Sequence, residues 1–546
     1  MKKLTMLVCA LLCAVTLSSC GNNDRGDGTG HMYDVSILGN PESLDPQYAT
    51  DSASNTIIKN LYSGLMSTDS NGNIMCCNAE SYTVSPDGLE YTFNLKNDNY
   101  WFFDENDDDI IDDNEYFPVT AGDYVFAFRR ILDPAMQSPY AESFSCIRNG
   151  SNIISGKALP ETAGVIAVDD YTLNISLDYP SAEFLGLLAT NPAMPCNRDF
   201  FYSTKGRYGL DDRSVMSNGS FFVRQWFYDP YGVNNILYMK RNEANRTETN
   251  EICPSFLNFT IESSEDDIRS MFKAEQIECF TTMNTGGLNL NKYTVNSSPA
   301  VTLGLIFNPD DECYSNMNIR KTLALSIDRK EIIKDTDSSD VKEAYGIIPP
   351  AVKLLGRSYR ELVADEQFEF YNIEEAKRCF EVGKAELQTE SLDGAKILVC
   401  NGTIDSSYLH KLSQNWQELF GFYIGIEEVT PTEFRRCIAE KDYTIALYPL
   451  NADYDSGISV IEQFEKNDCL KYSSDGSAVT DRIRKCADIS ELVDCYCAEE
   501  SGILDSYVFI PLFYKNSYLI MQDDNEDIIY DAFTGSLDFK YAKNYS

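Results

Sequence analysis

Hydrophobic and polar positions alternate with a period of two in several short segments of the chain. Residues 165–168 and 171–177 alternate on either side of Asp169-Asp170, which predicts two strands joined by a turn. Residues 82–84 and 89–95 do the same around Ser85-Pro86-Asp87-Gly88, a sequence typical of a tight turn. We therefore expect two β-hairpins in the first third of the chain.

Other segments have the spacing of an amphipathic helix. The clearest runs from residue 121 to Leu132, with Thr120 as the expected N-cap and Asp133-Pro134 as the stop. Strand-like and helix-like runs alternate along the rest of the chain, and no convincing internal repeat interrupts them. This pattern predicts a mixed α/β body.

The N-terminus has the order of a secretory signal. Lys2 and Lys3 precede an apolar run over 4–17, and Leu17-Ser18-Ser19 leads directly to Cys20. The run is shorter than the roughly 20 apolar residues that cross a bilayer. We predict a signal peptide over 1–19, lipidation of Cys20, and a flexible tether over 20–32; an uncleaved signal anchor is the alternative.

Composition limits the partners of the mature chain. Removal of residues 1–19 leaves 527 residues with 43 basic and 85 acidic side chains. A surface this acidic repels phosphate backbones, so we expect no nucleic acid partner, and the charge serves solubility. Of 17 cysteines, 14 remain beyond Cys20. Their pairing cannot be deduced from spacing, and we expect mostly reduced thiols packed in the core.

Histidine is nearly absent. His31 and His410 are the only two in the chain, and His31 lies in the predicted tether. A zinc hydrolase built on HExxH, or a nucleophile with a histidine base, is hard to assemble from so few histidines. The sequence therefore favours a binding protein over an enzyme, and no cofactor is required.

Eight segments, in order, resemble the family of peptide- and nickel-binding lipoproteins that serve ABC importers, with oligopeptide-binding proteins as the most similar branch. The resemblance extends over nearly all of the mature chain. The matching segments are Ser43-Leu44-Asp45-Pro46 with residues 60–65, residues 85–93, residues 118–123, residues 133–141, residues 218–221, residues 318–329, Ala452-Asp453-Tyr454-Asp455, and Ile510-Pro511-Leu512.

The resemblance implies a type II periplasmic-binding-protein fold, in which two α/β lobes are joined by a hinge and an extra domain is inserted in the first lobe. Mapped onto this chain, lobe I comprises 33–50, 187–300 and 507–546. The inserted domain comprises 51–186, and lobe II comprises 301–506. The resemblance also implies a monomer that closes around its ligand.

Ligand-binding residues follow from the resemblance by position. Asp453 is expected to pair with the α-ammonium of a peptide, and Tyr140 and Ser52 to contact the ligand in the same cleft. Asn451 and Tyr454 flank Asp453 and are expected at its edge. A turn-capping role for Asp453 and a core position for Tyr140 are the alternatives.

Departures from the family pattern affect the ligand class. Pro449-Leu450-Asn451 replaces a segment that usually carries Trp, and Thr281 and Thr282 occupy the place of a Tyr-Asn pair. His410 falls near a histidine that helps to hold a peptide carboxylate in relatives, with shortened spacing to Trp416. A surface histidine is the alternative.

The function implied is a substrate-binding protein of a bacterial ABC importer. It would be lipid-anchored at the outer face of the cell membrane and would deliver short peptides to the permease and ATPase subunits. A sensor lipoprotein that uses the same fold is one alternative, and an exported hydrolase is another, disfavoured by the two histidines.

One acidic segment, residues 104–115, is absent from the family pattern. Eight of its twelve residues are acidic, and its spacing is that of an EF-hand-like calcium loop. Asp109 stands where such loops have glycine. A solvated acidic loop is the alternative, and Ca²⁺ would have a structural role. The expected ligands are Asp104, Asn106, Asp108, the carbonyl of Ile110, Asp112 and Glu115.

Overall fold

The computed structural model describes residues 29–545 except 109–111, 233, 246–251, 335–339, 355, 364–367, 369–370, 390–391, 393 and 473–477. The predicted signal peptide, Cys20, most of the tether and Ile110 lie outside these residues. No helix in the described part of the chain combines the length and the apolar character needed to span a bilayer.

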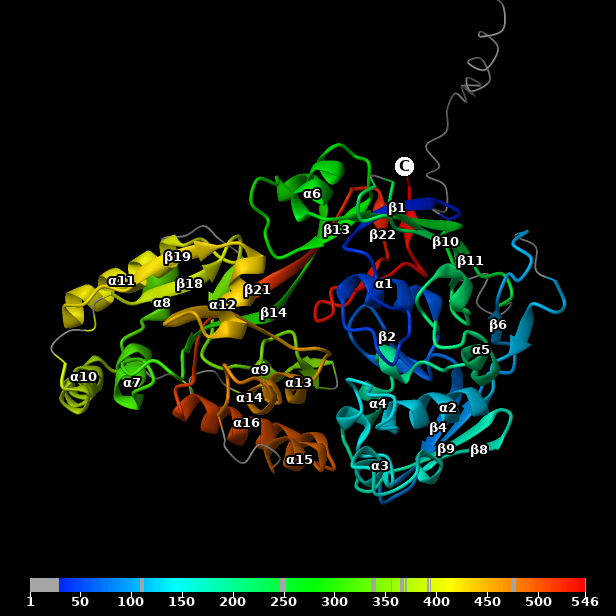
Figure 1. Ribbon diagram of the computed structural model, residues 1–546, viewed down its shortest axis with the longest axis horizontal. Coiled ribbons are helices and arrows are strands. Elements are labelled where there is room, and N and C mark those ends of the chain that lie inside the picture. Colours follow the sequence, from blue (N-terminus) through cyan, green and yellow to red (C-terminus); the bar gives the residue numbers. More distant parts are fainter. Residues whose placement is uncertain are drawn as a thin grey trace, which may run out of the picture.

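One mixed sheet of eleven strands runs through lobe I and lobe II. Its strands, in spatial order, are β10 (Phe221–Phe227), β11 (Ile236–Arg241), β12 (Phe256–Glu262), β1 (Met32–Leu38), β13 (Cys279–Thr282), β21 (Phe509–Met521), β14 (Thr294–Phe307), β20 (Ile445–Asn451), β18 (Lys396–Cys400) and β19 (Gly425–Val429), with β15 (Val341–Glu343) pairing β21 off this path. Figure 1 shows β14 and β21 crossing the middle of the molecule between two masses of helix and strand.

The predicted domain limits stay predictions, and we keep the names lobe I, inserted domain and lobe II for the residues that they cover. Lobe II packs helices on both faces of its part of the sheet. One face carries α7 (Met317–Leu325), α8 (Arg329–Ile333), α10 (Ile373–Leu387) and α11 (Ser407–Phe420). The other carries α9 (Tyr359–Leu362), α12 (Pro431–Glu440), α13 (Gly457–Ile461), α14 (Gln463–Lys466), α15 (Ala478–Arg484) and α16 (Ile489–Asp505).

The inserted domain contains a four-stranded antiparallel sheet in the order β4 (Ala79–Val84), β5 (Glu90–Leu95), β9 (Thr172–Ser176) and β8 (Val165–Asp169). Both predicted hairpins are confirmed, and Gly88 supplies the left-handed residue of the first turn at φ 71°. The helices of this domain are α1 (Ser52–Leu61), α2 (Ala121–Leu132), α3 (Gly150–Ile154) and α4 (Phe184–Leu187).

Local signals explain the limits of α2. The Thr120 amide donates to Asp123 Oδ2 at 2.8 Å, which satisfies one of the first free donors of the helix. Asp133 ends the helix in extended backbone before Pro134, as predicted. Tyr124 and Phe128 on its inner face are fully buried, so the helix is held to the sheet by apolar packing.

Lobe I and the inserted domain share one hydrophobic core. Val35 and Phe259 of lobe I belong to the same buried cluster as Phe93 and Phe128 of the inserted domain. Lobe I also contains α5 (Arg198–Ser203) and α6 (Glu265–Lys273), and the small hairpins β2 (Met66–Thr68) with β3 (Ile74–Cys76) and β6 (Tyr100–Phe102) with β7 (Tyr116–Pro118) pack nearby.

The C-terminal segment returns to lobe I. Its short strands are β22 (Asn525–Glu526), β23 (Ile529–Tyr530), β24 (Leu537–Asp538) and β25 (Lys543–Asn544), which form two small pairs; β16 (Lys353–Leu354) pairs β17 (Arg357–Ser358) in lobe II. Asn60 of α1 donates to the carbonyl of Leu537 at 2.7 Å, and Phe539 packs on Tyr33. Within the described residues the fourteen cysteines form no disulfide, and eight of them are buried.

Candidate ligand-binding site

The loop after β20 lies at the inner end of lobe II, beside the two crossing strands. β21 pairs with β13 at its lobe I end and with β14 in both lobes. β14 pairs in turn with β20, and this pairing sets Asn451 opposite Val301. Residues 452–456 therefore leave the sheet next to the crossing.

Asp453 lies in this loop. Its amide donates to Ser459 Oγ at 3.0 Å, which fixes the backbone. Its carboxylate is exposed, and none of the described residues donates a hydrogen bond to it. Desolvation by the surrounding protein and the negative charge of Glu462 raise the pKa of Asp453, and Lys466 lowers it. The backbone of Asp453 is thus fixed, and its carboxylate is open to a cationic partner.

Tyr140 approaches Asp453 from the inserted domain. Its hydroxyl donates to the carbonyl of Ala49. Burial, together with the nearby charges of Asp453 and Asp51, raises the pKa of Tyr140 to about 12. The predicted residues Tyr140 of the inserted domain and Asp453 of lobe II are therefore near enough for the charge of one to act on the other.

Asp51 is a polar residue of this region that the sequence reasoning missed. It is the N-cap of α1, and its Oδ1 accepts a hydrogen bond from Ser54 N at 2.8 Å. Its other oxygen, Oδ2, is buried and accepts no hydrogen bond from the described residues. Ser52, the predicted neighbour, is exposed as the first residue of the helix. An aspartate directly before the first residue of a helix is a common N-cap, and this signal could have identified Asp51.

Asn451 and Tyr454 flank Asp453 but differ in exposure. Asn451 is exposed, and its carbonyl accepts a hydrogen bond from Gln463 Nε2. Tyr454 packs against the core of lobe II, and burial raises its pKa well above the usual range. Asn451 thus faces the crossing, whereas Tyr454 supports the loop from behind.

The structure does not bring Thr282 or His410 to Asp453. Thr282 Oγ donates to Glu265 and accepts a hydrogen bond from Arg269 at 3.4 Å, both residues of α6. Thr281 precedes it in β13, opposite Leu519. His410 is exposed on α11, which lies along the outer side of lobe II in Figure 1, and its Nδ1 is 3.4 Å from Tyr423 Oη.

Direct contacts join the inserted domain to lobe II. The amide of Ala182 donates to the carbonyl of Cys486 at 3.0 Å. Glu183 Oε1 accepts hydrogen bonds from the hydroxyls of Ser456 and Tyr496. Lys353 of lobe II donates a hydrogen bond from Nζ to the carbonyl of Asn71 in the inserted domain. These contacts hold the inserted domain against lobe II.

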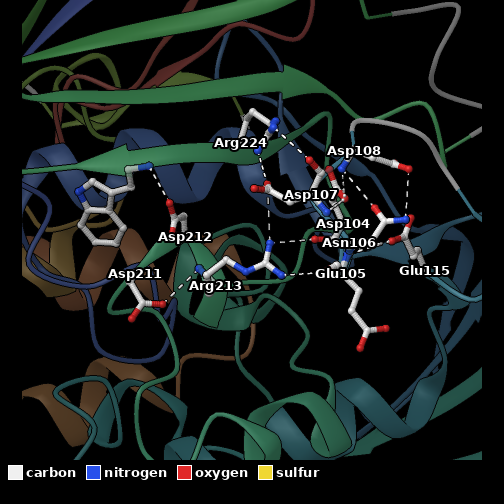
Figure 2. Close-up of polar contacts among 11 residues, drawn as sticks. Asp104, Glu105, Asn106, Asp107, Asp108, Glu115, Asp211, Asp212, Arg213 and Arg224 are labelled. Carbon is white, nitrogen blue, oxygen red and sulfur yellow. Dashed lines mark hydrogen bonds and ion pairs between the residues drawn. The ribbon is translucent and has the colours of Figure 1, made fainter.

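The described parts of the acidic loop, residues 104–108 and 112–115, lie between β6 and β7, on the side of the molecule away from lobe II (Figure 1). Among these described residues, Asp104 and Glu115 are the buried carboxylates. Asp104 Oδ1 accepts from Asp107 N at 2.7 Å, and Glu115 Oε1 accepts from Glu105 N at 2.9 Å. Figure 2 shows Asn106 between Asp108 and the Glu115 side of the loop.

Two arginines hold this loop to lobe I. Arg213 donates to the carbonyls of Asp104 at 3.0 Å and Glu105 at 2.7 Å, and Arg224 pairs with Asp107 (Figure 2). Asp107, at φ 65°, is the left-handed residue among the described part of the loop. No three or more His, Cys, Asp or Glu side chains in the described residues are placed to hold a metal ion. Calcium binding by the loop, including Asp112 and the undescribed Ile110, stays a prediction.

The chain matches a known family model over residues 77–470, that of the bacterial extracellular solute-binding proteins, family 5. The chain belongs to this family. Membership confirms the predicted resemblance and places the protein among binding proteins rather than enzymes. Similar proteins include oligopeptide-binding protein AliB of Streptococcus pneumoniae, 25% identical over 85% of this chain and 78% of that protein. Oligopeptide-binding protein OppA of Bacillus subtilis is 23% identical over 99% of both chains.

Solved structures share the fold. A peptide-bound OppA of Listeria monocytogenes matches with a TM-score of 0.71 and 21% identity over 95% of this chain and 99% of that chain. An oligopeptide-binding protein of Borrelia burgdorferi matches with a TM-score of 0.73 and 17% identity over 94% and 100% of the two chains. The predicted type II periplasmic-binding-protein fold is therefore confirmed for this member of family 5.

Proposed function

We propose that this protein captures short peptides between its lobes and delivers them to the permease and ATPase subunits of an ABC importer. The observation that carries the proposal is the exposed Asp453, whose carboxylate lies close enough to Tyr140 to raise its pKa and accepts no hydrogen bond from the described residues. A peptide α-ammonium is a partner of suitable charge and size. The names of the similar proteins, which are oligopeptide-binding proteins, support this ligand class.

Anchoring and delivery are further parts of the proposal. Cys20, after a signal-like segment, would carry lipid and hold the protein at the outer face of the membrane. Cells that express Cys20→Ala should release the protein into the medium, and unchanged membrane association would exclude this anchor. A sensor that uses the same cleft is the alternative, and peptide uptake that depends on this protein would distinguish transport from sensing.

Calorimetry with Asp453→Asn tests the ligand. Removal of one partner from a desolvated charge pair costs about 2 to 5 kcal/mol, so Kd for a free tripeptide should rise at least tenfold. The control is Asp468→Asn, an exposed carboxylate of the same segment, which should leave Kd unchanged. An N-acetylated tripeptide should bind the wild-type protein as weakly as the free peptide binds the variant. Equal binding of acetylated and free peptides would exclude recognition of the ammonium.

A further inference from the structure

Lys515 occupies an unusual position, in the middle of the crossing strand β21. It lies directly opposite Val301 of β14 on one side and Val341 of β15 on the other. Val301 also lies opposite Asn451 of β20. Directly opposed residues project from the same face of a sheet, so Lys515 shares a face with Asn451. It therefore lies two strands from the chain that leads into Asp453.

Lys515 is a buried residue without a close anionic partner. The residue is 4% exposed. Among the described residues, no carboxylate oxygen lies within 4.0 Å of Nζ and no acceptor receives a hydrogen bond from it. Burial lowers the pKa of Lys515, and the more distant charge of Asp340 raises it. Lysine is almost never fully buried unless it is paired, so the position is costly in the absence of a ligand.

Asp340 is engaged by other groups. Its Oδ1 accepts a hydrogen bond from the Tyr518 hydroxyl at 2.6 Å, and its Oδ2 accepts one from Thr285 Oγ at 3.1 Å. It acts on Lys515 through the field of its charge rather than through a direct contact. The charge of Asp340 therefore offsets part of the cost of desolvating Lys515, but the Asp340 carboxylate accepts no hydrogen bond from the Lys515 ammonium.

Two other cations in the interior of lobe II have hydrogen-bond or ion-pair partners. Arg360 pairs with Glu500, which is fully buried. Arg329 donates two hydrogen bonds to the carbonyl of Pro511, at 2.9 and 2.6 Å. Pro511 lies in β21, four residues from Lys515, so the contrast arises within one strand. The structure pairs its purely structural cations, and Lys515 departs from that pattern.

We propose that Lys515 is a specificity-determining residue that receives a carboxylate of the bound ligand. The inference rests on the proposed function and adds that the preferred peptides place an acidic side chain or their C-terminal carboxylate at this point of the cleft. An arriving carboxylate would supply the missing partner in surroundings from which water is excluded, where charge-assisted hydrogen bonds are strong. Neutral groups at the same point would leave the ammonium desolvated and unpaired.

Calorimetry with matched peptides tests this inference. The probes are tetra-alanine with a free or an amidated C-terminus, and versions with Glu or Gln placed in turn at each position. Wild-type protein should bind at least one carboxylate-bearing member ten to a hundred times more tightly than its neutral match. Position-dependent preference for Glu identifies a side-chain carboxylate, and preference for the free over the amidated terminus identifies the main-chain carboxylate.

Three variants make the result specific. Lys515→Met should abolish the preference while neutral peptides bind at least as well as before, and Lys515→Arg should retain it. Lys342→Met, an exposed lysine on the neighbouring strand β15, should change nothing. A uniform loss of binding for all peptides in Lys515→Met, or equal wild-type binding of charged and neutral members, would overturn the inference while the peptide function stands.

Failure of every peptide to bind would instead refute the proposed function. The Lys515 site is then probed with citrate alone, by melting temperature. A higher Tm in citrate for the wild-type protein and for Lys342→Met, but not for Lys515→Met, supports an anion site. Equal citrate effects on all three proteins would overturn it.

Discussion

Glu183→Ala should weaken ligand binding by opening the lobes. Glu183 lies in the inserted domain and accepts hydrogen bonds from Ser456 and Tyr496 of lobe II. Hydrogen bonds to charged groups contribute about 1.5 to 3 kcal/mol each. Ser456 and Tyr496 still contact one another at 3.1 Å, so the net loss should be nearer to about 2 kcal/mol for the pair. That corresponds to roughly a thirtyfold shift toward the open form.

The shift should appear in two measurements. Apparent Kd rises in proportion as the binding-competent fraction falls, so calorimetry should give up to a thirtyfold weaker Kd for Glu183→Ala. Small-angle scattering at saturating ligand should still show closure, at a higher ligand concentration. Glu161→Ala, an exposed glutamate of the same domain, is the control. Unchanged Kd and an unchanged ligand dependence of the radius of gyration would refute the role of these contacts.

The same contacts predict a pH dependence of closure. Burial raises the pKa of Glu183, while Ser456, Tyr496 and Arg484 lower it and Glu462 raises it. Burial also raises the pKa of Asp455 to about 7, with Asp531 and Glu183 raising it and Lys353 lowering it. In an open, hydrated form these carboxyls should titrate near their ordinary pKa values, about 4. Their effect on closure follows from this difference.

Closure should take up protons between about pH 4 and 7, because the pKa values are higher in the closed form. The closed form is then favoured at the acidic end, and the advantage is lost as the pH rises through the closed-state pKa. Asp455→Asn should flatten the pH profile of the radius of gyration at a fixed subsaturating ligand concentration. A wild-type profile that is flat over this window, or that runs in the opposite direction, would refute the argument.

Two further predictions concern stability and metal. Arg360→Met should lower the free energy of unfolding by about 3 to 5 kcal/mol, because it leaves the fully buried Glu500 without its cation. Urea denaturation measures this loss. A loss no larger than that caused by Glu374→Gln, which removes an exposed ion pair with Lys377, would contradict the prediction. If loop 104–115 binds calcium, Tm should be several degrees higher in calcium than in excess chelator, and Asp104→Ala should remove the difference. The same Tm in both conditions, with no calcium binding by calorimetry, would show that the loop is a solvated acidic loop.

Elements defined by neighbouring residues could be predicted from the sequence. The hairpin around Gly88 follows from a turn sequence between two alternating runs, and α2 follows from Thr120 and Asp123 at its start. The order of strands in the large sheet could not be predicted in this way. β1 lies between β12 and β13, more than two hundred residues away, and no local pattern records that pairing. The assignment of these distant segments to one lobe came from the family resemblance and not from the periodicity of the sequence.

The residues of the candidate site also differ in whether the sequence could identify them. Asp453 and Tyr140 were located by resemblance, and the structure sets them near one another. Glu183 was missed because its partners Ser456 and Tyr496 lie far away in the sequence and no local pattern records their contact. Lys515 also had a sequence signal, since the polar residues Lys515, Asn516 and Ser517 interrupt the apolar runs 508–514 and 518–521 and contradict the pattern of a buried strand. Such a conflict marks a position where burial serves something other than packing.

The covalent connection of lobe II to the rest of the chain runs through β14 and β21, because residues 308–508 leave by one strand and return by the other. The first described strand β1 and the C-terminal pair β22 and β25 both belong to the lobe I side (Figure 1). A pull applied to either end of the chain therefore loads lobe I and bypasses the moving lobe. A protein held by its N-terminus against flow or membrane motion would keep its opening and closing mechanically isolated from that drag.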